Sequence, residues 1–236
     1  MSEITARRFS GTRDFLPPDM IPREELFDKV KRVFSLYGYD PVETPAIEYM
    51  SVLSGKYGED ADHQLYRLDY KTGSKDEAGL RYDLTVPLSR LVAMAGQDVA
   101  LPFRRYQIQP VWRAERAQKK QGRYREFYQC DADCLGTESM LADAEIVVMV
   151  HTILAEVGLP DARVKVNDRK LLRAAIAHLG VAKEREFDLL RCVDKYDKVG
   201  IEGVEKELAK REFSPETVKR TVDFFASAAE ADDPFA

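Results

Sequence analysis

The feature of this 236-residue sequence that most restricts its fold is a pair of long extended runs near its middle. Residues 103–113 and 125–135 each have the length and composition of a strand. The segment between them, 114–124, is too polar and too long for a tight turn. Two such runs in succession predict one long β-hairpin with an extended connecting loop.

The segments around this hairpin alternate between helical and extended patterns. The two prolines at the end of residues 11–18 predict a fixed loop there, because proline lacks a backbone donor. Apolar spacing and capping residues predict helices from Pro22 to a stop at Gly38, over 85–95, from a cap at Thr137 or Ser139 to Gly158, and from a cap at Asp168 to Gly180. β-branched and aromatic runs predict extended segments over 39–47, 66–70, 80–82 and 164–166.

The composition of the chain changes after Val181, where charged sequence with helical patterns begins. Residues 214–216 (SPE) form a clear helix start in this part. The sequence therefore predicts two domains, a core over 1–180 and a small helical module over 181–236.

Composition excludes several classes of protein. The longest apolar run considered, residues 146–150, is far shorter than the roughly 20 residues that a membrane helix needs. The first residues carry no basic-then-apolar export signal, and three cysteines do not make a disulfide framework. We therefore expect a cytoplasmic protein with reduced thiols and no membrane association.

The net charge of −5 hides one concentrated basic stretch. Residues 103–125 contain eight cations against the single anion Glu115. Such a stretch indicates a local site for phosphate or nucleic acid, and the alternative is a solvated, charged hairpin.

Side chains on a strand alternate between faces, so residue parity sorts the hairpin. The even positions of the returning strand are predicted to face the core, with two buried structural thiols: Tyr128, Cys130, Ala132 and Cys134. The odd positions combine an aromatic ring, amides and charges: Arg105, Gln107, Gln109, Arg113, Phe127, Gln129, Asp131 and Asp133. Burying such groups unpaired costs about 1–3 kcal/mol each, so this face meets either solvent or a polar ligand.

Four ordered motifs resemble those of class II aminoacyl-tRNA synthetases, specifically the histidyl-tRNA synthetase family. Residues 112–115 (WRAE) and 122–131 (GRYREFYQCD) flank a basic loop as in motif 2, and residues 39–45 (YDPVETP) after the first helix resemble motif 1. Residues 11–17 (GTRDFLP) are similar to the opening signature of the family, and residues 80–87 (LRYDLTVP) to its amino-acid-binding segment. Within that segment the chain has Asp-Leu-Thr where many bacterial members have Glu-Gly-Thr, so it resembles the eukaryote-like branch of the family. The resemblance implies an α+β fold, with an antiparallel class II sheet flanked by helices.

The same resemblance implies an activity and a site. The parent reaction joins histidine to ATP as histidyl-adenylate and then transfers histidine to tRNA(His), with Mg²⁺ accompanying ATP. Arg113 would be the catalytic residue that binds the α-phosphate and the histidine carboxylate. The rest of the histidine site would be Asp83, Thr85, Gln129 and Asp133, with Asp133 facing the imidazole. The ATP site would add Glu115, Arg123 and Phe127, and no residue is assigned to a metal.

The resemblance also implies macromolecular partners. The loop residues expected to meet the acceptor end of tRNA are Arg116, Gln118, Lys119 and Lys120. Motif 1 implies a homodimer. For Asp83, pairing with Arg81 or capping the following helix is the alternative to a ligand role. No catalytic role is expected for His63, His151 or His178.

The sequence departs from the family where motif 3 and an anticodon-binding domain would follow. The last residues resemble a helical insertion between motifs 2 and 3, so we expect this chain alone to activate histidine poorly. Two other readings remain open. One is a synthetase-like regulatory subunit that binds histidine without catalysis, and the other is a plain RNA-binding module.

Overall fold

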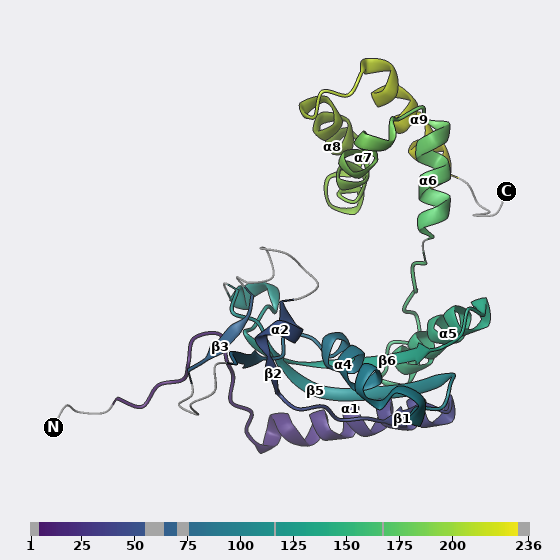
Figure 1. Cartoon of the computed structure of the whole chain (residues 1–236). Coiled ribbons are helices and arrows are strands. Elements are labelled where there is room, and N and C mark those ends of the chain that lie inside the picture. Colours follow the sequence, from purple (N-terminus) through teal and green to yellow (C-terminus); the bar gives the residue numbers. More distant parts are fainter. Residues whose placement is uncertain (1–4, 55–63, 70–75, 116, 167, 231–236) are drawn as a thin grey trace. The chain divides into compact units, whose positions relative to one another are not determined.

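The computed structural model describes residues 5–54, 64–69, 76–115, 117–166 and 168–230. They form two compact units, Met1–Val164 and Lys165–Ala236 (Figure 1). The division falls before helix α6 (Arg169–His178), whereas the sequence pattern put it after Gly180. The physical reason is that Ile176 and Leu179 are buried in the core of the second unit.

The predicted hairpin is the centre of the first unit. Strand β5 (Phe103–Trp112) pairs antiparallel with β6 (Glu126–Leu135) along its whole length. The short strand β1 (Asp40–Pro41) pairs parallel with β5 at the other edge, so β5 is central in this three-stranded sheet. Pro41 is tolerated there because an edge strand can lose a backbone donor.

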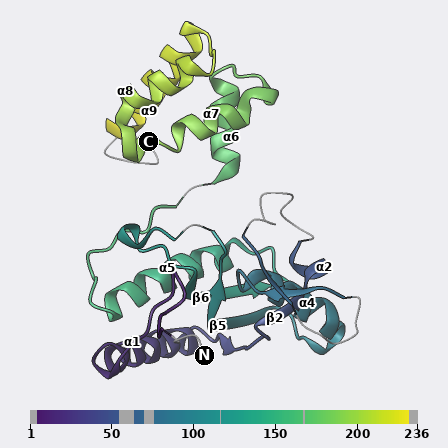
Figure 2. The same ribbon diagram turned by 90° about the vertical axis from the view of Figure 1, so that its left-hand side faces the viewer.

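Two helices cover one face of this sheet, as Figures 1 and 2 show. Helix α1 (Pro17–Leu36) and helix α5 (Met140–Glu156) contribute Val33, Phe34 and Met149 to a core with Tyr106 of β5. Helix α1 starts at Pro17, so the prediction of a loop through residue 18 was wrong. Prolines at the first helical positions lose no hydrogen bond, since those N–H groups have no partner inside the helix. Ser139 caps α5, as predicted, by accepting from the backbone N–H of Leu141.

This covered face is the even face of the hairpin, but its coverage is incomplete. Ala132 and Cys134 pack against the α1–α5 core, whereas Tyr128 and Cys130 are exposed. The prediction that Cys130 is a buried thiol was therefore wrong, because the α1–α5 core includes Ala132 and Cys134 but not Cys130.

A second, smaller sheet lies beside the hairpin. Strand β4 (Ala78–Leu80) pairs antiparallel with both β2 (Ile47–Tyr49) and β3 (Tyr66–Leu68). The short helix α2 (Met50–Leu53) follows β2, and helix α4 (Thr85–Ala95) leads into the 3-10 turn η1 (Gly96–Asp98). The strands are shorter than predicted, and residues 42–46 between β1 and β2 lie outside any strand.

The second unit is helical, as predicted for the end of the chain. It consists of α6, the 3-10 turn η3 (Lys183–Arg185), α7 (Glu186–Val193), α8 (Tyr196–Lys210) and α9 (Pro215–Glu230). Leu189, Val204 and Leu208 form the centre of its core. The predicted strand at 164–166 is wrong, since these residues have no ladder partner among the described strands.

Candidate active site

The polar face of the hairpin is assembled by the strand register. Arg105 lies directly opposite Asp133, Gln107 opposite Asp131, and Gln109 opposite Gln129. The neighbouring positions Tyr106 and Ala132 point into the α1–α5 core. The odd side chains therefore share the other face, as parity predicted, and six polar groups meet on it.

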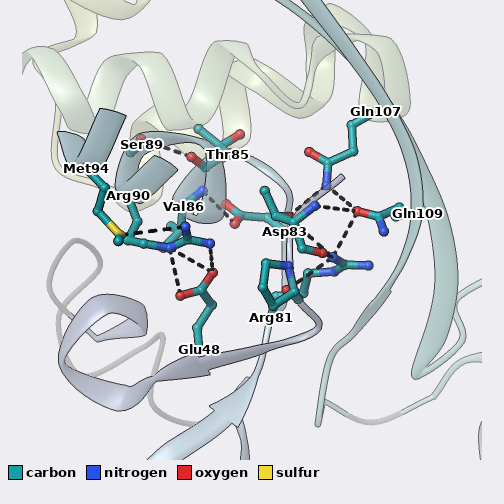
Figure 3. A network of polar contacts seen from close by, with 12 residues as sticks. Glu48, Arg81, Asp83, Thr85, Val86, Ser89, Arg90, Met94, Gln107 and Gln109 are labelled. Atoms are coloured by element: carbon teal, nitrogen blue, oxygen red, sulfur yellow. Dashed lines mark hydrogen bonds and ion pairs between the residues drawn. The ribbon is translucent and has the colours of Figure 1, made fainter. Parts of the chain in front are cut away.

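A buried arginine links this face to the smaller sheet. Arg81 follows β4 and is only 1% exposed. Its Nη1 donates to the carbonyl oxygen of Thr44 at 2.5 Å and to Oε1 of Gln109 at 3.0 Å (Figure 3). Its Nε donates to the carbonyl oxygen of Pro110 at 3.0 Å. Burial lowers the pKa of Arg81, opposed by the nearby carboxylates of Glu43 and Glu48.

The same network continues along β5 to the far end of the face. Nε2 of Gln107 donates to Oγ1 of Thr44 at 2.8 Å and also to Oε1 of Gln109. Oε1 of Gln107 accepts from Nη1 of Arg105 at 2.9 Å. Nη2 of Arg105 then forms an ion pair with Oδ2 of Asp133 at 2.5 Å. A continuous chain of polar contacts thus runs from Arg81 to Asp133. Arg105 was expected on this face from residue parity, but no ligand role was predicted for it or for Arg81.

Asp83 and Thr85 lie where the chain turns into α4. The Oδ1 atom of Asp83 accepts the backbone N–H of Val86 at 3.1 Å, which caps the first turn of the helix (Figure 3). Asp83 therefore makes the capping contact that the sequence offered as one possibility. Thr85 is the first residue of α4 and is half-buried. The cap fixes both residues at the helix N-terminus, where the helix dipole favours an acid.

Charges from three elements meet around Asp131. Burial raises the pKa of Asp131, the guanidinium of Arg105 opposes this rise, and the carboxylate of Asp133 reinforces it. Asp83 adds to the rise and Arg113 opposes it. The structure therefore brings the predicted residues Asp83, Asp133 and Arg113 into one electrostatic cluster. Asp131 belongs to that cluster although no role was predicted for it from the sequence.

Gln129 lies on the same face with an unused acceptor. Its Oε1 atom is buried and has no hydrogen-bond partner among the described residues. A buried acceptor without a partner costs about 1–3 kcal/mol. A ligand that brings an N–H donor to this face would remove that cost.

Arg113 and Phe127 are adjacent at the end of the hairpin where the connecting loop begins. The guanidinium of Arg113 lies over the ring of Phe127, 5.1 Å from its centroid. Nε of Arg113 donates to the carbonyl oxygen of Tyr82 at 3.1 Å. The backbone N–H of Arg113 donates to the carbonyl oxygen of Arg125 at 2.8 Å. These contacts hold a planar cation and an aromatic ring together at one end of the polar face.

The N-terminal segment holds the base of the connecting loop. The backbone N–H of Arg125 donates to the carbonyl oxygen of Gly11 at 2.8 Å. The Arg125 side chain donates to the carbonyl oxygens of Ser10 and Glu115, at 3.1 and 3.2 Å. The backbone of Ser10 and Gly11 thus anchors the base of the loop through Arg125, a contact that the sequence pattern did not reveal.

The loop itself is closed and carries exposed polar groups. Gln118 and Arg123 form an isolated antiparallel bridge around the 3-10 turn η2 (Lys119–Gln121). Gln118, Lys120 and Arg123 are exposed. Arg116 lies outside the described residues, as does His63. The other two histidines, His151 and His178, are exposed on α5 and α6.

No group of three or more His, Cys, Asp or Glu side chains able to hold a metal occurs in the part of the chain that the structure describes. Within the same ranges, no helix has the length and apolarity needed to cross a membrane.

Comparison with known proteins agrees with this geometry. The family model of histidyl-tRNA synthetase matches residues 11–233, which is nearly the whole chain. The chain belongs to the histidyl-tRNA synthetase family.

Individual relatives give the same result. The histidine–tRNA ligase of Cytophaga hutchinsonii is 43% identical over 234 residues, covering 91% of this chain and 51% of the relative. The crystal structure of histidyl-tRNA synthetase from Nostoc sp. PCC 7120 matches 98% of this chain and 50% of that one, with a TM-score of 0.82 and 30% identity. The class II synthetase fold expected from the sequence is therefore confirmed, and the chain spans about half the length of the relatives that it matches.

A third structure bears on the regulatory alternative. An ATP phosphoribosyltransferase regulatory subunit/histidyl-tRNA synthetase from Bacillus halodurans C matches 96% of this chain and 57% of that one. Its TM-score is 0.76 and its identity is 26%. The fold alone thus does not separate a synthetase from a regulatory subunit, and the residues of the polar face must do so.

Proposed function

We propose that this chain supplies the histidine- and ATP-binding part of a histidine–tRNA ligase. The reaction joins histidine and ATP to histidyl-adenylate and pyrophosphate, then transfers histidine to the 3′ end of tRNA(His). The observation that carries the proposal is the single polar face on which Arg113, stacked on Phe127, shares an electrostatic cluster with Asp83 and Asp133.

The acidic part of the face suits an amino acid with a ring N–H. Asp83, Thr85 and Gln129 would take the α-amino group of histidine, and the buried Oε1 of Gln129 would gain a donor. Asp133 would accept an N–H of the imidazole. Ring analogues without that donor would leave the carboxylate unpaired, which is the physical basis of selection.

The cationic part suits the nucleotide. Phe127 would stack on adenine, and Arg113 would contact the α-phosphate and the histidine carboxylate. As a carboxylate oxygen attacks the α-phosphorus and pyrophosphate leaves, a fixed cation stabilises the growing charge. Arg123 would contact the outer phosphates. Glu115 would hold adenine or Mg²⁺, which would arrive with ATP, because Mg²⁺ needs only one or two protein carboxylates beside phosphates.

The exposed connecting loop would receive the tRNA acceptor end through Arg116, Gln118, Lys119 and Lys120. Gln118 and Lys120 are open to solvent, as contact with a large partner requires. Cationic contacts to phosphates position a nucleic acid without reading its sequence.

We also propose that the protein is a homodimer formed through motif 1. Apolar side chains beside that motif are open to solvent: Leu36 is 74% exposed and Ile47 55%. Tyr49 and Met94 line an apolar groove of about 740 Å³ together with Ile47. Sedimentation of the chain and of an Ile47→Lys variant tests this, and a concentration-independent monomer would refute it.

Three unpaired cysteines support a reducing, cytoplasmic location.

The regulatory subunit is the second candidate, because a neighbouring structure bears that name. A subunit that only senses histidine has no use for an arginine stacked on a nucleotide-binding ring. The retained pair of Arg113 and Phe127 therefore favours the ligase.

Titration calorimetry of histidine into the purified chain, with and without ATP and Mg²⁺, tests the proposal. We expect binding that Asp133→Ala weakens and that ATP strengthens, while Asp143→Ala, an exposed acid on α5, leaves it unchanged. Histidine binding indifferent to ATP would favour the regulatory subunit, and RNA binding with no histidine binding would favour an RNA-binding module.

A further inference from the structure

We propose that Arg105 is a positioning residue that determines which ring the site accepts. By holding one carboxylate oxygen of Asp133, it would fix the other oxygen as an acceptor aimed at a ring N–H of the substrate. This inference rests on the proposed function and adds to it a specificity determinant that makes no contact with the substrate.

The geometry of the pair sets apart the two oxygens of Asp133. Arg105 is 0% exposed and lies directly opposite Asp133 in the hairpin register. Its Nη2 contacts Oδ2 of Asp133 at 2.5 Å, and that oxygen is buried. The side chain of Asp133 as a whole is still 32% exposed. The exposed part therefore lies away from Oδ2, on the side of the polar face.

Arg105 is itself fixed from behind. Its Nη1 donates to Gln107, whose amide nitrogen donates to Thr44, and Thr44 accepts in turn from the buried Arg81. Two buried guanidinium groups, joined through the side chain of Gln107 and through the hydroxyl and carbonyl oxygens of Thr44, thus form a support for Asp133. Because a buried cation without a partner is strongly unfavourable, the guanidinium of Arg105 stays with its carboxylate.

If the ion pair of Arg105 and Asp133 served stability alone, its carboxylate would not need to reach the polar face. Replacing a buried ion pair by apolar side chains of similar size is often neutral or stabilising. Here the carboxylate instead reaches the face that carries the unpartnered Oε1 of Gln129 and the acid Asp131. The ion pair therefore joins a support inside the protein to an acceptor at its binding surface.

Ring selectivity distinguishes this role from a structural one. The probes are L-histidine and β-(2-thienyl)alanine, whose ring has similar size and no N–H donor. In the unmodified chain we expect histidine to bind about 10- to 100-fold more tightly, because the bound analogue covers the acceptor oxygen of Asp133 without giving it a donor. Arg105→Met should lower this ratio several-fold. Arg105→Lys should restore part of it, because lysine keeps the charge without the planar fork.

A double-mutant cycle tests whether Arg105 acts through Asp133. In a chain that already carries Asp133→Asn, adding Arg105→Met should not lower the ratio further. The double variant also removes both charges together, so it should fold even if Arg105→Met alone does not. Arg104→Met is the matched control, since Arg104 is the neighbouring residue on β5 and pairs with Glu145 of α5 at 3.4 Å. It should leave the ratio unchanged.

Several results would overturn the inference. One is an Arg105→Met chain that binds both probes more weakly by the same factor. Another is a loss of selectivity that persists in the Asp133→Asn background. If the unmodified chain binds no histidine, the proposed function itself fails. Thermal unfolding of the unmodified chain, Arg105→Met, Asp133→Asn and the double variant then still reports whether Arg105 and Asp133 are coupled. Additive changes in the free energy of unfolding would refute the support role.

Discussion

The guanidinium of Arg113 lies 5.1 Å from the ring centroid of Phe127, and the two residues stand on opposite sides of the connecting loop. Arg113 follows β5 and Phe127 lies in β6, so the hairpin register holds them together. The cation is further fixed by the carbonyl oxygen of Tyr82. A base that stacked on Phe127 would therefore place its phosphates within reach of a cation that is already oriented.

Replacing the ring should weaken ATP binding selectively. Base–aromatic stacking contributes about 1–3 kcal/mol, so we expect Phe127→Leu to weaken ATP binding about 5- to 100-fold. Histidine affinity measured without ATP should change little. Tyr128→Leu is the matched control, because the adjacent Tyr128 points to the other face and stacks on Phe27. Equal losses of ATP affinity in the two variants, measured by calorimetry, would contradict the role of Phe127.

The contact between the N-terminal segment and the loop depends on a glycine. Gly11 has φ +88°, and a Cβ there would lie 2.9 Å from the Arg125 side chain. We expect Gly11→Ala to cost about 1–3 kcal/mol of stability, from backbone strain and this clash together. Amide exchange at Arg125, whose N–H donates to Gly11, should accelerate.

Gly122→Ala separates the two causes. Gly122 also has a positive φ, +71°, but a Cβ there meets nothing within 4 Å. It should therefore show the backbone cost of about 1 kcal/mol alone. If both variants lose the same free energy of unfolding, the close approach to Arg125 contributes nothing.

The core of the second unit gives a prediction for unfolding. Leu208 is fully buried there, and every member of its cluster belongs to that unit. We expect Leu208→Ala to cost about 2–5 kcal/mol, whereas Leu171→Ala, at a site 70% exposed, costs less than about 0.5 kcal/mol. The single tryptophan, Trp112, lies in the first unit, so its fluorescence reports that unit and far-ultraviolet circular dichroism reports both. A shift of the dichroism transition without a matching shift in fluorescence is the expected result, and identical shifts would refute it.

Tyr39 predicts a loss of stability at alkaline pH. Its side chain is buried and its hydroxyl donates to Glu145 at 3.1 Å. Burial, then the hydrogen bond and charge of Glu145, raise the pKa of Tyr39 to about 12. Because the unfolded chain releases this proton near pH 10, the contribution to stability is complete below that pH. It is lost as pH rises from about 10 to about 12.

The measurement is the free energy of unfolding across this pH range. Tyr39→Phe should flatten the alkaline fall, whereas Tyr49→Phe, at an exposed tyrosine, should leave it unchanged. An absorbance titration that shows Tyr39 ionising with the exposed tyrosines would contradict the prediction.

Sequence alone determined the hairpin, its two faces and the position of α4. The physical reason is that strand alternation and helix periodicity are local properties of the backbone. Parity placed Arg105, Gln129 and Asp133 on one face, and motif resemblance identified the family. The sequence also offered a capping contact for Asp83 as one possibility, and the structure contains that contact.

Tertiary structure decided the features that depend on distant partners. The strand predicted at 164–166 has no ladder partner among the described strands. Cys130 is exposed, because the α1–α5 core includes Ala132 and Cys134 of β6 but not Cys130. The pairing of Arg105 with Asp133, and the support that Thr44 and Arg81 give it, join segments far apart in the chain. Local pattern cannot contain such contacts, because burial and hydrogen bonding across elements exist only after the chain has folded.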